Sequence, residues 1–245
     1  MSKQSAADIS NRIGAALERD PRVNLHHSPV TVGTANNRVC LEGRMESIAE
    51  KRAAVDAATR VLFTQKDWTL EDRLHVHPTE RKEDLELQEL VESALGNEPA
   101  FRDYTLVAEA MDKRETIHDA GSADRSITAS IHEGAITLTG RVESLTHSRL
   151  AEVLMWWTSG CSFVQNMLEI VPPEEDNDDE LNDAVRIVLE KDPLVHADQL
   201  SVATAGGVVV MNGAVATTQE KRFAVLDAWC VPGVSDVVDR IEALD

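Results

Sequence analysis

The sequence has 245 residues, of which 42% are hydrophobic and 27% are charged. This composition is ordinary for a globular protein and excludes wholesale disorder. The 24 basic and 43 acidic residues give a formal net charge of −19, which repels nucleic-acid phosphates and anionic lipid headgroups. We therefore expect no nucleic-acid partner.

Targeting signals and cysteine spacing bear on where the protein works. The first twenty residues contain no apolar run of signal-peptide type, and no stretch is apolar enough to span a bilayer, so we expect no integral membrane segment. We expect a cytoplasmic protein, or a periplasmic one if a leader had been removed. Cys40, Cys161 and Cys230 are widely spaced and odd in number, which favours reduced thiols in packing over a disulfide framework.

An amphipathic helix followed by an acid-proline pair is predicted three times along the chain. Its apolar residues recur at i, i+4, i+7 and i+8, which places them on one stripe, and the proline disfavours helical geometry just before it. The three sets are Ile9, Ile13, Ala16 and Leu17 before Asp20-Pro21; Leu87, Val91, Ala94 and Leu95 before Glu98-Pro99; and Leu181, Val185, Val188 and Leu189 before Asp192-Pro193.

Each helix is followed by two extended stretches, the second with alternating apolar residues as a half-buried strand requires. These pairs are Val39 and Leu41, Ile136 and Leu138, and Val209 and Met211, and the glycines Gly43, Gly140 and Gly213 are predicted to end the strands. A second helix then carries Arg52, Arg149 or Arg222 at one repeated position. A last strand follows, with Leu74, Leu168 and Ile241 among its apolar residues.

The sequence thus predicts an α+β protein of three tandem α-β-β-α-β modules, each a three-stranded mixed sheet with two helices on one face. The predicted modules are residues 6–77, 80–171 and 178–245. The segments between them, His77-Pro78-Thr79 and Pro172 to Glu180, are predicted to be solvated linkers.

These features resemble the BON family, named for bacterial osmotically induced and nodulation proteins. The third copy carries the clearest set, with Asp192-Pro193, Gly206-Gly207-Val208, Met211-Asn212-Gly213 and Pro232-Gly233-Val234. The first copy lacks the Pro-Gly-Val element, and the second has Ser159-Gly160-Cys161 in its place. The resemblance implies phospholipid or envelope association, osmotic stress tolerance or potassium binding, and it implies no catalytic residues or cofactor.

The repeated glycines and arginines are the first candidate site residues. Gly43, Gly140 and Gly213 would present backbone to a ligand, but glycine more often serves a strand end or turn, so we interpret them as structural. Arg52, Arg149 and Arg222 would bind an anion through a planar fork, but recurrence on a helix favours a structural contact such as a salt bridge between modules.

Two further patterns resemble metal sites but are better explained otherwise. His75 and His77 lie two apart on a predicted strand, with His26 and His27 as further ligands for a transition metal, and unpaired strand-edge histidines are the simpler interpretation. Asp176, Asp178 and Glu180 mimic the start of a calcium loop, but Leu181 occupies the glycine position. We predict no metal site, and a potassium site made of backbone carbonyls would leave no sequence signature.

The second copy contains about twenty extra residues, at about 103–125, compared with the other two. Val107, Met111 and Ile117 among charged residues are compatible with a short amphipathic helix or a lid, but a tolerated loop insertion is the favoured interpretation. Trp156 and Trp157 are adjacent on a predicted helix, so they do not share a face, and we expect one of them to contact another module or another chain.

The sequence contains no P-loop, no G-x-S-x-G and no G-x-G-x-x-G motif, so we expect no enzyme. It predicts a non-enzymatic ligand-binding or scaffold protein, which the resemblance links to osmotic stress or potassium. The alternative is a phospholipid or envelope-associated module. The expected partners are a small ligand or cation and contacts between modules or between copies of the chain.

Overall fold

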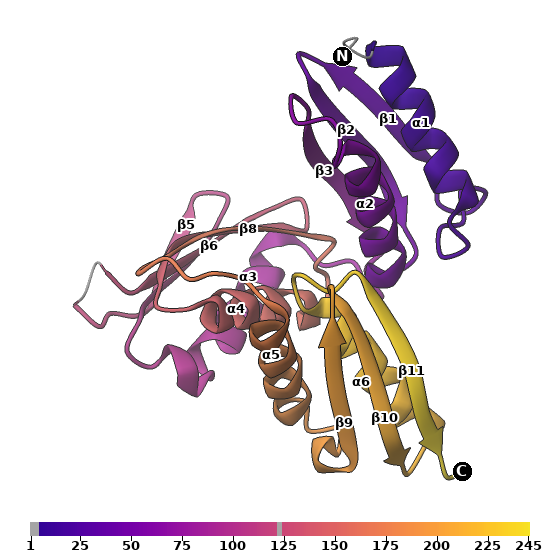
Figure 1. Cartoon of the computed structure of the whole chain (residues 1–245). Helices are drawn as coiled ribbons and strands as arrows, with labels where there is room; N and C mark the ends of the chain where they lie inside the picture. The colour runs from indigo at the N-terminus through magenta and orange to yellow at the C-terminus, as the bar shows by residue number, and fades with distance from the viewer. Residues whose placement is uncertain (1–4, 122–123) are drawn as a thin grey trace. The chain divides into compact units, whose positions relative to one another are not determined.

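A computed structural model describes residues 5–121 and 124–245. The chain divides into two compact units, Met1–His77 and Pro78–Asp245. The first unit is one module, and the second unit contains two modules packed together (Figure 1).

The first module has one helix, a hairpin, a second helix and a closing strand. Its sheet has the order β1-β2-β3, in which β1 pairs with β2 antiparallel and β2 pairs with β3 parallel. The elements are α1 (Ala6–Arg19), β1 (Val30–Ala35), β2 (Arg38–Met45), α2 (Ile48–Leu62) and β3 (Thr69–Val76).

The third module repeats this arrangement. Its sheet has the order β11-β10-β9, with β9 antiparallel and β11 parallel to the central strand. The elements are α5 (Asp178–Lys191), a short 3-10 helix η2 (Ala197–Gln199), β9 (Leu200–Ala205), β10 (Val208–Val215), α6 (Thr218–Cys230) and β11 (Asp236–Ala243).

The second module has the same frame with two added strands. Its elements are α3 (Asp84–Gly96), η1 (Pro99–Phe101), β4 (Thr105–Ala110), β5 (Lys113–His118), β6 (Ser126–His132), β7 (Ala135–Val142), α4 (Leu145–Trp157) and β8 (Phe163–Ile170). The sheet order is β5-β4-β6-β7-β8. The three-module α+β fold is confirmed, and the second sheet has five strands instead of three.

The added strands correct the interpretation of 103–125 as a loop insertion, a helix or a lid. Leu106, Ala108 and Ala110 alternate along β4 and are buried in the core, because they lie on the face of the sheet that α3 covers. Met111 has a φ of 53° and is 79% exposed at the turn between β4 and β5. The segment is therefore a β-hairpin that extends the sheet, and Ser122 and Ala123 lie outside the described residues.

The first helices form where the apolar stripes predicted them. Ile9, Ile13 and Leu17 are at most 1% exposed, and α1 begins at Ser5, whose side chain accepts a hydrogen bond from the backbone of Asp8. The helices α1 and α5 end at Arg19 and Lys191, and Asp20 and Asp192, which precede the prolines, are their C-caps.

The repeated glycines lie inside the central strands, and the prediction that they end them is wrong. Each is the sixth of eight residues in β2, β7 or β10. A Cβ atom on Gly140 would lie 2.1 Å from the carbonyl oxygen of Ser126, and one on Gly213 would lie 2.1 Å from that of Gln199. Glycine is required because the neighbouring backbone approaches too closely for a side chain.

Candidate functional site at the junction of the second and third modules

The side chain of Arg149 lies between the second and third modules and is only 5% exposed. Its Nη2 atom lies 2.6 Å from Oδ1 of Asp176, and its Nε donates to the carbonyl oxygen of Pro232 at 3.0 Å. Gly233 follows that proline, and a Cβ on it would lie 3.3 Å from the same Nη2 atom. One guanidinium thus joins α4, the acidic linker and the turn after α6.

The acidic linker before α5 is exposed over residues 172–177, which agrees with the predicted solvated linker, and it also contacts α4. Oε2 of Glu174 accepts a hydrogen bond at 2.8 Å from the backbone nitrogen of Leu145, the first residue of α4. A carboxylate at a helix N-terminus satisfies a free N–H group and interacts favourably with the helix dipole. With the Arg149–Asp176 pair, this contact fixes the linker at two points.

A second ion pair joins the two modules at their acid-proline pairs. Nζ of Lys191, the last residue of α5, lies 2.6 Å from Oε1 of Glu98, whose side chain is 7% exposed. The same Glu98 oxygen accepts a hydrogen bond from the backbone nitrogen of Ala100 at 2.9 Å. Because Glu98 is buried and doubly bound, this contact is more than a screened surface pair.

A buried carboxyl group, Asp227 on α6, completes the junction and is 4% exposed. Burial, together with the neighbouring Asp192 carboxylate, raises the pKa of Asp227 to about 8, and a hydrogen bond with Trp157 opposes the shift. Asp192 caps α5 and accepts the backbone hydrogen of Leu194 at 2.8 Å. Asp227 is therefore largely protonated at neutral pH.

The two adjacent tryptophans do different things. Trp156 packs against the core of its own module, and its Nε1 donates to Oε1 of Glu152 at 3.4 Å. Trp157 bonds to Asp227 of the third module. The structure places Trp157 at a contact between modules and Trp156 in the core, and the prediction that either binds another chain stays a prediction.

The three repeated arginines occupy different environments. Arg149 is buried at the junction, Arg52 is half-buried on α2, and Arg222 is exposed on α6. At Arg149 the salt bridge is with Asp176 of the linker, and the contact with the third module is the hydrogen bond to the carbonyl oxygen of Pro232. The recurrence of arginine in the sequence did not indicate that the three side chains lie in different environments.

A lysine that pairs with an aspartate of the last strand recurs in the first and third modules, and sequence reasoning missed it. Lys51 pairs with Asp72 and donates to the carbonyl oxygen of Leu74 at 2.7 Å. Lys221 lies 3.0 Å from Asp239 and donates to the carbonyl oxygen of Ile241 at 2.6 Å. The lysine precedes the repeated arginine in both modules, so the overlay of copies contained the signal.

The second module replaces this ion pair with neutral groups. Asn166 donates to the carbonyl oxygen and to the hydroxyl of Ser148, at 3.1 and 3.0 Å. His147, which precedes Ser148, lies against Tyr104 with ring centroids 5.5 Å apart, and burial lowers the pKa of His147. The second module thus differs from its neighbours beyond its inserted hairpin.

The histidines and the calcium-like run are not brought together as metal ligands. His75 lies half-buried on β3, His77 follows that strand, and His27 contacts Asn24. Across residues 5–121 and 124–245, no three His, Cys, Asp or Glu side chains form a group suited to a metal ion. Asp178 instead accepts the backbone hydrogens of Gly206 and Gly207 at 2.8 and 3.1 Å, which lowers its pKa.

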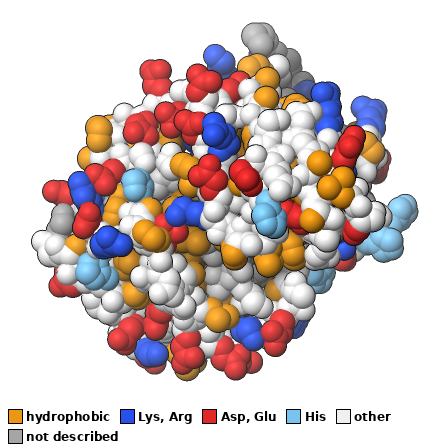
Figure 2. Space-filling model, turned by 90° about the horizontal axis from the view of Figure 1, so that it is seen from below, with side chains coloured by type: hydrophobic (Ala, Val, Ile, Leu, Met, Phe, Trp, Pro, Cys, Tyr) orange, Lys and Arg blue, Asp and Glu red, His pale blue; other side chains and the backbone are white. Residues whose placement is uncertain are grey.

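No helix in the described part of the chain has the length and apolar character needed to cross a membrane. Acidic side chains are spread over the face drawn in Figure 2, with basic and apolar side chains between them. This distribution offers no extended basic surface on that face.

Comparison with known proteins gives one family, and the solved structures that match include two of one secretion-system protein. The family model of the BON domain matches residues 5–63, 108–172 and 177–245. No curated protein sequence matches the chain. The C-terminal domain of CdsD, a structural protein of the Type III secretion system of Chlamydia trachomatis, covers 99% of this chain and 100% of its own, with 13% identity and a TM-score of 0.25. A second structure of CdsD covers 97% and 92%, with 15% identity and the same TM-score.

Proposed function

Because the chain belongs to the BON domain family, we propose that it is a non-enzymatic scaffold whose second and third modules form one fixed binding platform. The family is generally a non-catalytic binding module, which agrees with a binding or scaffold role. The proposed module boundaries are residues 6–77, 80–171 and 178–245. The observation that carries the platform is the buried Arg149, which bonds to both the linker and the third module.

The junction supports a platform because two of its buried charged side chains have partners beyond their own module. Glu98 and Arg149 each have a side chain at most 7% exposed, and each bonds to a partner beyond its own module. Separating the modules would leave these groups buried without partners or would require their hydration. Breaking a buried charged pair is strongly destabilising, so the two modules should move as one body.

The small ligand proposed for this platform is a monovalent cation, potassium, in connection with osmotic stress. The net charge of −19 raises the local concentration of cations around the chain. A site made of backbone carbonyls at turns would select among cations without a carboxylate cluster. The phospholipid alternative is disfavoured by the same charge, since anionic vesicles repel an acidic surface.

A thermal-shift screen tests the ligand with the full chain in sodium, potassium, calcium or zinc chloride and with soluble lipid headgroups. A ligand that binds only the folded state raises Tm. We expect the Tm in potassium chloride to be at least about 2 °C higher than the Tm in sodium chloride at equal concentration. Equal Tm values in the two salts would end the potassium proposal. Co-sedimentation with anionic vesicles in low salt would favour the phospholipid alternative.

A further inference from the structure

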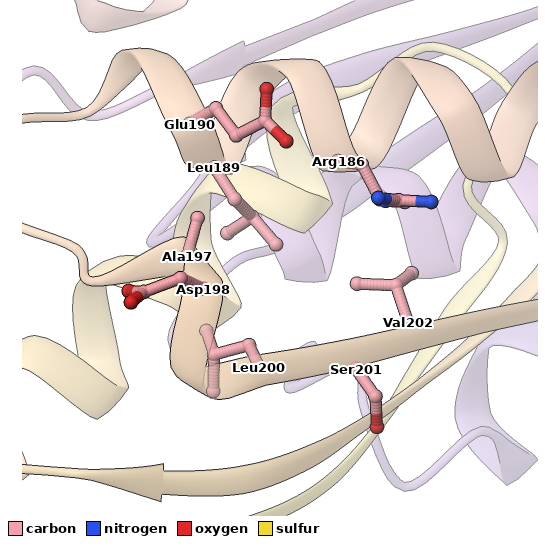
Figure 3. Close-up of a pocket in the computed structure, with 8 residues that line it drawn as sticks. All are labelled: Arg186, Leu189, Glu190, Ala197, Asp198, Leu200, Ser201 and Val202. Atoms are coloured by element: carbon pink, nitrogen blue, oxygen red, sulfur yellow. The ribbon is translucent and has the colours of Figure 1, made fainter.

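An open cleft of about 600 Å³ lies in the third module between α5 and the edge strand β9. Leu189 and Arg186 point from the helix toward the strand, and Leu200 and Val202 lie on the strand below them (Figure 3). Glu190 and Asp198 lie at the end where β9 begins. The lining is thus apolar along its length and charged at its ends.

The second module shows what such a cleft holds when it is filled. There β4 pairs parallel with β6, the strand equivalent to β9, and packs beneath α3. Ala108 of β4 lies beside Ala129, and Ala110 lies beside Ile131. The cleft in the third module occupies the position that β4 takes in the second, because α5 and β9 correspond to α3 and β6 in the repeat.

Burial along the edge strand shows that this position is incomplete in the third module. Ile127, Ala129 and Ile131 of β6 are at most 4% exposed beneath the added strand. The equivalent residues of β9 are only half-buried, namely Leu200, Val202 and Thr204. Since these three side chains face the core side of the sheet, their partial exposure arises at the open edge.

Equivalent residues on α3 and α5 also differ between the second module, where the position is filled, and the third module, where it is open. Nε2 of Gln88 on α3 lies 3.4 Å from the carbonyl oxygen of Ala108 on the added strand, in hydrogen-bonding geometry. Asn182, at the equivalent place on α5, is shorter and accepts a hydrogen bond from Thr204 of β9 at 3.5 Å. A Cβ on Gly96 would lie 3.0 Å from Ile117 of the hairpin, whereas Glu190 occupies that position in α5.

We propose that the α5–β9 cleft binds an extended segment of a partner protein, which adds to the sheet as a strand parallel to β9. The segment carries small or apolar residues at alternate positions, as β4 does, because alternate side chains enter the space under the helix. Its charges complement the ends of the cleft. A basic residue lies at its amino end, beside Glu190 and Asp198, and an acidic residue lies at its carboxyl end, toward Arg186.

The proposed strand partner rests on the scaffold function proposed above and names the class of partner that the scaffold binds. In the second module, the chain's own strand β4 already occupies the equivalent position. The hairpin covers the edge of β6, so that edge is closed to a partner. The third module keeps its edge open and supplies the binding site. A domain-swapped second copy of the chain is a different occupant, which the experiment separates.

The probe is a synthetic peptide with the sequence of residues 104–110, a lysine added at the amino end and a glutamate at the carboxyl end. The matched peptide exchanges the lysine and the glutamate, so that composition and net charge are equal. Binding to the full chain is followed by fluorescence anisotropy, and hydrogen exchange reports the amides of β9. We expect the first peptide to bind, to protect β9, and to bind about threefold more tightly than the second.

Two variants locate the binding site. Val202→Lys places a charge on the core-facing side of the edge strand and should weaken peptide binding at least about tenfold. Ala203→Lys makes the same charge change on the exposed face of the same strand and should alter binding less than about twofold. If Val202→Lys lowers Tm markedly, Thr204→Lys takes its place in the comparison.

The proposal is overturned if neither peptide binds, or if Val202→Lys and Thr204→Lys bind as well as the unmodified chain. It is also overturned if sedimentation shows a dimer that Val202→Lys dissolves, because a second copy would then be the occupant. These failures would leave the scaffold proposal standing. That proposal is tested separately at Arg149, outside the cleft.

Discussion

Arg149 of α4 donates its Nε hydrogen to the carbonyl oxygen of Pro232, 83 residues further along the chain, at 3.0 Å. The same guanidinium holds Asp176 of the linker at 2.6 Å. A side chain at a repeated position of the second module is thereby a structural part of the third.

Replacing Arg149 by alanine should destabilise the chain by about 2–4 kcal/mol, because the removal of a side chain that is 5% exposed leaves a cavity and the carbonyl oxygen of Pro232 loses its hydrogen bond. Arg222→Ala removes the equivalent arginine of the third module, which is exposed, and should cost less than about 0.5 kcal/mol. Urea denaturation of the two variants measures both changes. Equal effects would contradict the role assigned to Arg149.

Replacing Asp227 by asparagine should stabilise the protein increasingly between about pH 4 and pH 8. In the folded state the pKa of Asp227 is raised to about 8, so the native chain loses stability as pH rises through this window. Asparagine stays neutral and avoids that loss, which gives a gain of about 5 kcal/mol at pH 8 and little at pH 4.

The measurement is urea denaturation of Asp227→Asn at pH 5 and pH 8, with the exposed Asp183→Asn as control. The control should show the same small change at both pH values. A gain for Asp227→Asn that does not grow with pH would contradict the buried, protonated carboxyl.

The hairpin in the second module should behave as core. Leu106→Ala removes a side chain that is 2% exposed and should cost about 2–4 kcal/mol. Met111→Ala alters the turn, where the side chain is 79% exposed, and should cost less than about 0.5 kcal/mol. Thermal denaturation compares the stability of the two variants. A larger loss of stability for Met111→Ala than for Leu106→Ala would contradict the hairpin.

Replacing glycine by alanine should change the stability in opposite directions at two positions. Gly140→Ala places a Cβ 2.1 Å from the carbonyl oxygen of Ser126 at a φ of 128° and should destabilise by about 2–4 kcal/mol. Gly14→Ala lies in the middle of α1 with no atom within 4 Å of the new Cβ and should stabilise by about 0.5–1 kcal/mol. Denaturation curves that show both variants stabilised, or both destabilised, would be inconsistent with the close approach of the Ser126 backbone to Gly140.

The repeated elements were predictable because each rests on a local pattern. Ile9, Ile13 and Leu17 form one helical stripe, and Val39 and Leu41 alternate as a strand requires, and all five are buried. The acid-proline pairs end helices α1 and α5 because the residue before proline avoids helical geometry.

The hairpin was mispredicted because two periodicities overlap in one segment. Val107 and Met111 lie four apart, as on a helix, whereas Leu106, Ala108 and Ala110 alternate, as on a strand. Alanine carries a weak strand signal, so the pairing of β4 with β6 settles the conformation. Such a long-range pairing leaves no local pattern.

The junction was only partly visible in the sequence for the same reason. Adjacent Trp156 and Trp157 indicated that one of them leaves its core, but nothing local identified Asp227 as a partner. The glycines were recognised as structural, yet their cause is the approach of the neighbouring strand. Side chains whose partners lie in another module need the fold before they can be interpreted.

The platform itself is tested most directly by native-state hydrogen exchange of the full chain in moderate urea. We predict that amides of β7 and β10 exchange through openings of equal free energy, and that Arg149→Ala lowers both while Arg222→Ala lowers neither. Different opening free energies for β7 and β10, with Arg149→Ala affecting β7 alone, would show that the two modules open independently and would contradict the platform.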